Sequence, residues 1–138
     1  MNSTAILWPM VVQVVLVYVV YVMVSLRRIE SVRAGEAKAG DFRVPQTEAE
    51  RSAVVVRNLS NQFELPVLFF VVSILFYATS GADIVVVVLA WAFVVSRIAH
   101  AYVHITANRI RHRRPLFIVG FAINGFLWLW FAIKLLQM

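Results

Sequence analysis

The chain has 138 residues, of which 62% are hydrophobic and 14% charged, with a formal net charge of +6. Soluble domains carry roughly 45–50% apolar and about 25% charged residues, so the composition excludes an ordinary soluble domain and indicates an integral membrane protein. The absence of Cys excludes disulfide scaffolds and Cys-ligated metals. Most of the thirteen Lys and Arg residues flank apolar runs, which favours a membrane surface over nucleic acid as the partner of the positive charge.

The first apolar run covers residues 6–26, about 21 residues, which is enough to cross a hydrocarbon core of about 30 Å. No Lys or Arg precedes it and no small-residue cleavage site is visible, so we expect the span to be retained. The polar and charged stretch over residues 27–47 is predicted to be a loop.

A second helix is predicted from Thr47 to about Ala78, with its membrane span over residues 58–78. Thr47 and Glu50 have the spacing of a capping box, in which a hydroxyl and a carboxylate satisfy free backbone donors at a helix start. Pro66 lies inside this helix and removes one backbone donor, so a kink is expected there, which serves either packing or a ligand site.

The third span is predicted over residues 84–107, after a turn so short that the second and third helices must be antiparallel neighbours. Residues 108–114 form a basic connector. Pro115 is expected at the first position of the fourth helix, whose span covers residues 116–136. Gly120 suits close contact between this helix and a neighbour.

Basic residues set the orientation of these spans. Seven lie between Arg27 and Arg57 and four between Arg109 and Arg114, whereas the turn at residues 79–83 has none. By the positive-inside rule, the first and third connectors are cytosolic and both termini are non-cytosolic. The sequence thus predicts one all-α domain over residues 1–138, a bundle of four transmembrane helices, and its short loops favour a bacterial inner membrane.

Polar residues interrupt the spans with helical spacing. On the predicted second helix, spacings of four and three residues place three polar side chains within an arc of ~60°: Arg57, Asn61 and Glu64. On the predicted third helix, five polar side chains lie within an arc of ~80°: Arg97, His100, His104, Asn108 and Arg111. Each helix therefore carries one polar seam.

Counting residues outward from the shared turn brings the two seams to the same depth. Glu64 lies 17 residues before Gly81 and Arg97 lies 16 after it, and Asn61 and His100 are level as well. We infer a polar site that opens toward the cytosol. An alternative is that Glu64 and Arg97 form an ion pair that only holds the helices together.

The basic connector strengthens the case for an anionic ligand. Its four arginines precede a helix start, where free backbone N–H groups also favour an anion, although such a connector commonly serves only as an anchor for lipid headgroups. His100 and His104 have the spacing of a metal-binding pair, but the flanking residues supply no third ligand, so no metal site is predicted. A transport path is disfavoured because residues 84–95 are uninterrupted and apolar.

This arrangement resembles the MAPEG family, the membrane-associated proteins in eicosanoid and glutathione metabolism. The similarity is carried by four short spans, a long first loop, the motif Arg57-x-x-x-Asn61-x-x-Glu64, and Arg97-x-x-His100 followed by an arginine-rich link. The resemblance implies a homotrimer with glutathione bound between adjacent subunits near the cytosolic face. Some relatives carry a Tyr at the position of Phe117, and one family member binds lipid without glutathione chemistry.

The resemblance also implies roles for individual residues. The glutathione-binding set would be Arg28, Arg57, Asn61, Glu64, Arg97, His100 and His104. Arg113 and Arg114 would be catalytic, because their positive charge near the sulfur favours the thiolate. The implied activity is that of a glutathione transferase or peroxidase acting on hydrophobic electrophiles or lipid hydroperoxides from the bilayer. The alternative is a non-catalytic lipid-binding or scaffold protein with the same fold.

Overall fold

The structure, a computed structural model, describes residues 3–43 and 48–137. These residues are almost all helical and include no strand. Within this part of the chain, four helical stretches are long and apolar enough to cross a membrane, so the protein is a multi-pass integral membrane protein. The long helices are α1 (Leu7–Arg33), α2 (Glu50–Gln62), α3 (Leu65–Ala78), α4 (Ile84–Ile105) and α5 (Ile110–Leu135); the 3-10 turns are η1 (Ser3–Ile6) and η2 (Ala39–Arg43).

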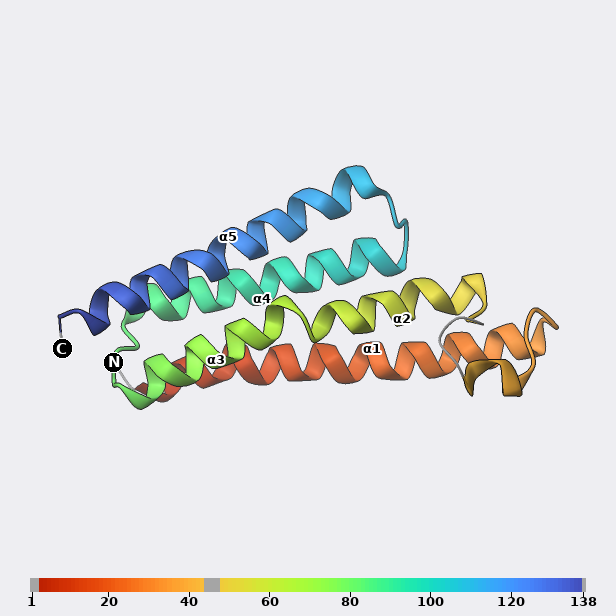
Figure 1. The fold of residues 1–138 in the computed structure, drawn as a ribbon, viewed down its shortest axis with the longest axis horizontal. Helices are drawn as coiled ribbons and strands as arrows, with labels where there is room; N and C mark the ends of the chain where they lie inside the picture. The colour runs from red at the N-terminus through yellow and green to blue at the C-terminus, as the bar shows by residue number, and fades with distance from the viewer. Residues whose placement is uncertain (1–2, 44–47, 138) are drawn as a thin grey trace.

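The helices form an elongated bundle in which α4 contacts α1, α2 and α5 (Figure 1). Both termini lie at the end of the bundle where α3 turns into α4. At that turn the Asp83 carboxylate caps α4 by accepting a hydrogen bond from the Val86 amide, 3.0 Å away. Lys134 of α5 binds Asp83 at 2.6 Å and the Gly81 carbonyl at 3.0 Å, which fastens this end of the bundle.

The second membrane crossing is broken instead of merely kinked. α2 ends at Gln62, Phe63 and Glu64 leave the helical path, and α3 starts at Leu65 with Pro66 in its first turn. A proline is tolerated there because the first backbone N–H groups of a helix have no partner within it. The break frees carbonyl groups in the last turn of α2 in the middle of the bundle. Thr47, the predicted cap of this helix, lies outside the described residues, and Ala49 occupies the cap position.

The fourth crossing starts earlier than predicted. α5 begins at Ile110, so Pro115 lies inside it and not at its first position. Asn108 explains the early start: its positive φ of 45° reverses the chain directly after α4, and Asn tolerates this conformation better than most residues. The basic residues expected in a connector therefore lie on the first turns of α5.

The apolar core occupies the half of the molecule near the termini. Its centre is the stacked pair Phe69 and Phe93, whose ring centroids are 4.4 Å apart, with Phe76 packed edge-on against Phe131. Nearer the start of α5, Gly120 allows a close approach to α4, because a Cβ there would lie 2.9 Å from Ser96 Oγ. This contact sets the spacing of α4 and α5 next to the polar half of the bundle.

Candidate functional site

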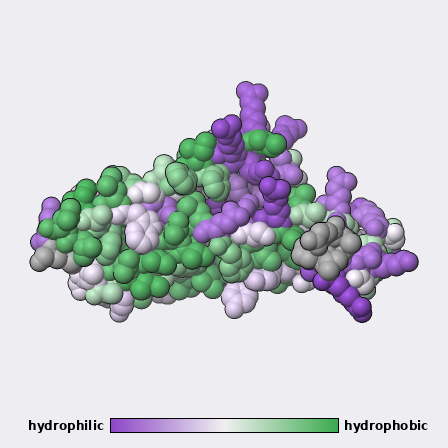
Figure 2. All heavy atoms as spheres, in the orientation of Figure 1, coloured by the Kyte–Doolittle hydropathy of each residue, from purple (hydrophilic) through white to green (hydrophobic). Residues whose placement is uncertain are grey.

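A pocket of about 320 Å³ opens between α2, α4 and the first turns of α5. Its lining residues are Arg57, Asn61, Glu64, His100, Ile110, Arg113, Arg114 and Phe117. Figure 2 shows hydrophilic side chains gathered around this region, whereas hydrophobic side chains cover the half near the termini. The structure therefore brings six of the predicted site residues together from three helices.

Arg97 lies beneath this group and is fully buried. Its Nη2 donates to the Asn61 carbonyl at 3.3 Å, one of the carbonyls freed by the break after α2, and its guanidinium lies 5.9 Å from the centre of the Phe117 ring. Within the described residues, its Nε and Nη1 atoms have no hydrogen-bond partner. A buried cation with free donors suits an anionic ligand, because unpaired buried polar groups are unfavourable.

The alternative interpretation, in which a Glu64–Arg97 ion pair only holds the helices together, does not fit the contacts of these two described residues. No ion pair in the described parts of the chain joins the two side chains, because Arg97 binds the main chain of α2 while the Glu64 side chain is exposed at the pocket. The Glu64 carboxylate, in the break after α2, therefore faces the pocket together with the exposed Arg57 of α2.

Arg113 and Arg114 line the pocket from α5, and they sit within the helix and not before it. Arg113 is held in place by a 2.7 Å hydrogen bond from its Nη1 to the Asn108 side-chain oxygen. Arg111, on the same turns, is exposed and lines a separate apolar hollow with Pro115 and Ile118. It is therefore not part of the cluster that its spacing indicated.

His100 and His104 are both buried on α4, with their rings edge-to-face at 5.6 Å. His100 lines the pocket, whereas His104 does not and instead meets Asn58 of α2, with Nδ1 3.2 Å from the Asn58 amide nitrogen. The described residues contain no group of three or more His, Cys, Asp or Glu side chains that could hold a metal ion.

Three buried polar residues behind the site did not stand out in the sequence. Gln13 Nε2 donates to Gln62 Oε1 at 2.9 Å, and Gln62 Nε2 donates to Asn58 Oδ1 at 3.2 Å, so the row continues to His104. The available signal was the four-residue spacing of Asn58 and Gln62, which puts them on one face of α2. That face of α2 is the buried one, and Arg57 and Asn61 lie along its edge.

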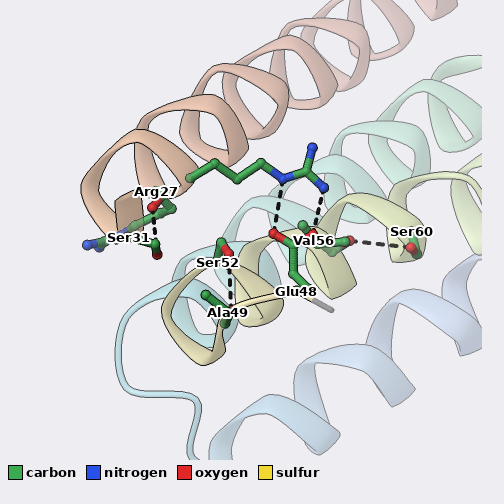
Figure 3. Close-up of polar contacts among 8 residues, drawn as sticks. Arg27, Ser31, Glu48, Ala49, Ser52, Val56 and Ser60 are labelled. Carbon is green, nitrogen blue, oxygen red and sulfur yellow. Dashed lines mark hydrogen bonds and ion pairs between the residues drawn. The ribbon is translucent and has the colours of Figure 1, made fainter. Parts of the chain in front are cut away.

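Arg28 lies apart from the cluster. Its guanidinium makes two hydrogen bonds to the Glu48 carboxylate, at 3.0 and 2.7 Å, drawn in Figure 3, and it lies 5.2 Å from the centre of the Phe42 ring. The hydrogen bond from Arg28 holds the pKa of Glu48 below its usual value. Within this chain, Arg28 therefore fastens the loop end of α1 to the start of α2.

Comparisons with known proteins agree with the resemblance found in the sequence. The model of the MAPEG family matches residues 5–133, nearly the whole chain. No curated protein and no solved structure matches the chain.

Proposed function

Because the chain belongs to the MAPEG family, the membrane proteins of eicosanoid and glutathione metabolism, we propose that it is a glutathione-dependent transferase or peroxidase. The observation that carries this proposal is the pocket between α2, α4 and α5, which combines three arginines, one carboxylate and one amide. Glutathione presents two carboxylates, one ammonium group and two amides, so the charges are complementary. The volume of about 320 Å³ falls in the range of about 300–1,000 Å³ typical of small-molecule pockets.

In this proposal two residues of α2 and Glu64, in the break after α2, bind the peptide. Arg57 takes a carboxylate through paired hydrogen bonds, Glu64 takes the ammonium group, and the Asn61 side chain bonds the peptide backbone. The free N–H groups of Arg97 and the His100 ring add donors from α4. The exposed charged groups thus recognise the ends of the tripeptide, and the buried groups hold its centre.

Arg113 and Arg114 would act on the sulfur. A nearby positive charge favours the thiolate over the thiol, and the thiolate is the nucleophile. With an organic halide, the sulfur–carbon bond forms as the carbon–halogen bond breaks, halide leaves with the electron pair, and the thiol proton goes to water. Phe117 offers no hydroxyl, so stabilisation of the thiolate rests on the arginines.

With a lipid hydroperoxide, the thiolate attacks the terminal oxygen and the oxygen–oxygen bond breaks. The lipid alkoxide takes a proton and leaves as an alcohol, and the glutathione sulfur becomes a sulfenic acid. A second glutathione condenses with it to give the disulfide and water, so two glutathiones reduce one hydroperoxide.

The same proposal includes the assembly and its setting. The chain would form a homotrimer in a bacterial inner membrane, with both termini non-cytosolic and the pocket open to the cytosol. The resemblance to the family gives Arg28 a contact with glutathione, which in this proposal Arg28 would make in the trimer in exchange for its bonds to Glu48. The hydrophobic substrate would enter from the bilayer.

Turnover tests the catalytic part directly. We expect the protein in detergent to conjugate glutathione to an aryl halide or to reduce an organic hydroperoxide, and Arg113→Leu to lower kcat roughly 100-fold. Arg109→Leu is the matched control, because Arg109 is exposed at the start of the same helix and does not line the pocket. Absence of thiol turnover together with a co-purifying lipid would favour the non-catalytic lipid-binding scaffold.

A further inference from the structure

A row of buried side chains crosses three helices behind the pocket. Gln13 comes from α1, Gln62 and Asn58 from α2, and His104 from α4, and each is at most 1% exposed. Consecutive members are joined at 2.9, 3.2 and 3.2 Å. Four buried polar side chains in one connected row indicate a specific role, since isolated polar groups are unfavourable in this environment.

The hydrogen bonds in the row all run in one direction. Gln13 donates to Gln62, Gln62 donates to Asn58 Oδ1, and Asn58 therefore presents its Nδ2 donor to His104 Nδ1. A ring nitrogen that accepts a hydrogen bond carries no proton, and in the neutral imidazole the proton is then on the other nitrogen. The direction of the amides thus assigns the proton of His104 to Nε2.

The opposite direction is less favourable. In the observed arrangement, the fully buried atom of the row that has no hydrogen-bond partner among the described residues is the Gln13 side-chain oxygen. Reversing all three amides would leave the Gln13 NH₂ group without an acceptor instead. Buried oxygens lacking a partner are tolerated better than buried N–H groups, so the observed direction is the more stable one.

We propose that Gln13, Gln62 and Asn58 are positioning residues that hold His104 in the Nε2–H tautomer directly behind His100, which lines the pocket. The His104 ring packs edge-to-face on His100, which lines the pocket. The tautomer of His104 therefore determines which of its two ring nitrogens carries an N–H donor next to His100. The consequence for ligand binding rests on the proposed glutathione site, whereas the tautomer itself does not.

Nitrogen NMR of the ¹⁵N-histidine-labelled protein in detergent tests the tautomer directly. At about pH 8, above the ordinary histidine pKa of about 6.5, long-range ¹H–¹⁵N correlations distinguish the protonated from the unprotonated ring nitrogen. The His104 signals are assigned by their loss in His104→Gln. We expect the proton on Nε2; a proton on Nδ1, or an averaged mixture, would overturn the proposal.

Substitutions in the row test the cause. Asn58→Asp replaces the donor by an acceptor of the same shape, so we expect the His104 proton to move to Nδ1 and glutathione binding to weaken roughly five- to tenfold. Gln62→Leu frees the Asn58 amide to turn over and should give a mixture of tautomers, which keeps the test available if Asn58→Asp does not fold. Ser60→Ala is the matched control, because Ser60 is exposed on the same helix and bonds only the Val56 carbonyl among the described residues.

The outcomes separate the two proposals. An unchanged tautomer in both Asn58→Asp and Gln62→Leu would overturn the positioning role, even if glutathione binds. The expected tautomer, shifted by Asn58→Asp, in a protein that does not bind glutathione would support the role of the row and contradict the proposed function.

Discussion

The two halves of the bundle are stabilised in different ways. In the half near the termini, α3 packs on the first part of α4 and the last part of α5 through a continuous apolar core centred on Phe69 and Phe93. In the other half, the site half, α2 meets the second part of α4 through Arg97, His100, His104 and the amides of Asn58 and Gln62, all buried.

The break between α2 and α3 marks the boundary between these halves. On the side of the break toward the termini, the chain forms the apolar helix α3. On the other side, the freed Asn61 carbonyl accepts a hydrogen bond from the buried Arg97 guanidinium. Apolar contacts therefore stabilise one half, whereas the other half buries a guanidinium and an imidazole, in which Arg97 Nε and Nη1 and His100 Nδ1 have no partner among the described residues. Such groups destabilise the free protein and suit a ligand.

Removing a ring from the apolar half should have the largest effect on stability. Phe93→Ala leaves a cavity against Phe69, and we expect a loss of about 3–5 kcal/mol in the free energy of unfolding, measured in detergent. Phe121→Ala, at a position 61% exposed, should change it by less than about 1 kcal/mol. Equal effects would contradict the location of the core.

Adding one carbon at the contact between α4 and α5 should come next. Gly120→Ala pushes a Cβ to 2.9 Å from Ser96 Oγ, so we expect a loss of about 1–3 kcal/mol and weaker ligand binding. Gly125→Ala, on the same helix with no atom within 4 Å of the added carbon, should stabilise by about 0.5–1 kcal/mol. The same sign for both variants would mean that Gly120 does not set the helix spacing.

The site half should respond in the opposite sense to removal of its buried cation. Arg97→Met deletes a buried guanidinium whose Nε and Nη1 nitrogens have no partner among the described residues, so we expect the ligand-free protein to gain about 1 kcal/mol in unfolding free energy while ligand binding is lost. Thermal melting with and without glutathione measures both effects. A clear loss of stability would show that Arg97 serves the fold alone.

The smallest effect is expected at the loop end, where the Glu48 carboxylate binds Arg28. The pKa of Glu48 is lowered by this hydrogen bond, so the bond stabilises the fold fully above the unfolded pKa of about 4.5, and the stabilisation is lost as the pH falls through the folded pKa. Glu48→Gln should therefore lower the Tm at pH 7 by an amount equivalent to less than about 1 kcal/mol, a difference that disappears in acid.

Glu30→Gln provides the comparison for this pH dependence. Glu30 pairs with Arg27 one helical turn away, and its side chain is 47% exposed against 5% for Glu48. A more exposed pair is more strongly screened, so its removal should change the Tm less at every pH. A larger change in Glu30→Gln would contradict the assigned role of Glu48.

The sequence predicted the four-helix membrane fold and the family, because long apolar runs and the Arg57, Asn61 and Glu64 motif are local signals. It also predicted that the polar seams of two helices meet. In antiparallel neighbours joined by a short turn, residues equally far from that turn along the two helices lie at the same depth. The structure confirms that the fold is helical and places Asn61 beside Arg97.

The sequence predicted the ends of helices and the partners of side chains less well. Pro66 and Pro115 are each compatible with a helix start or a helix interior, and tertiary contacts decide between these positions. Arg97 reaches a main-chain carbonyl that is free only because α2 breaks, and the pairing of Arg28 with Glu48 depends on how the loop returns. These features follow from three-dimensional packing, which no local pattern encodes.

Calorimetry of glutathione binding in detergent tests the central claim, that the pocket of the site half binds this peptide. We expect saturable binding that weakens at least tenfold in Arg57→Ala and is unchanged in Arg51→Ala, an exposed arginine on the same helix that binds Glu36. No binding up to millimolar concentration, or equal binding by Arg57→Ala and the unsubstituted protein, would contradict it.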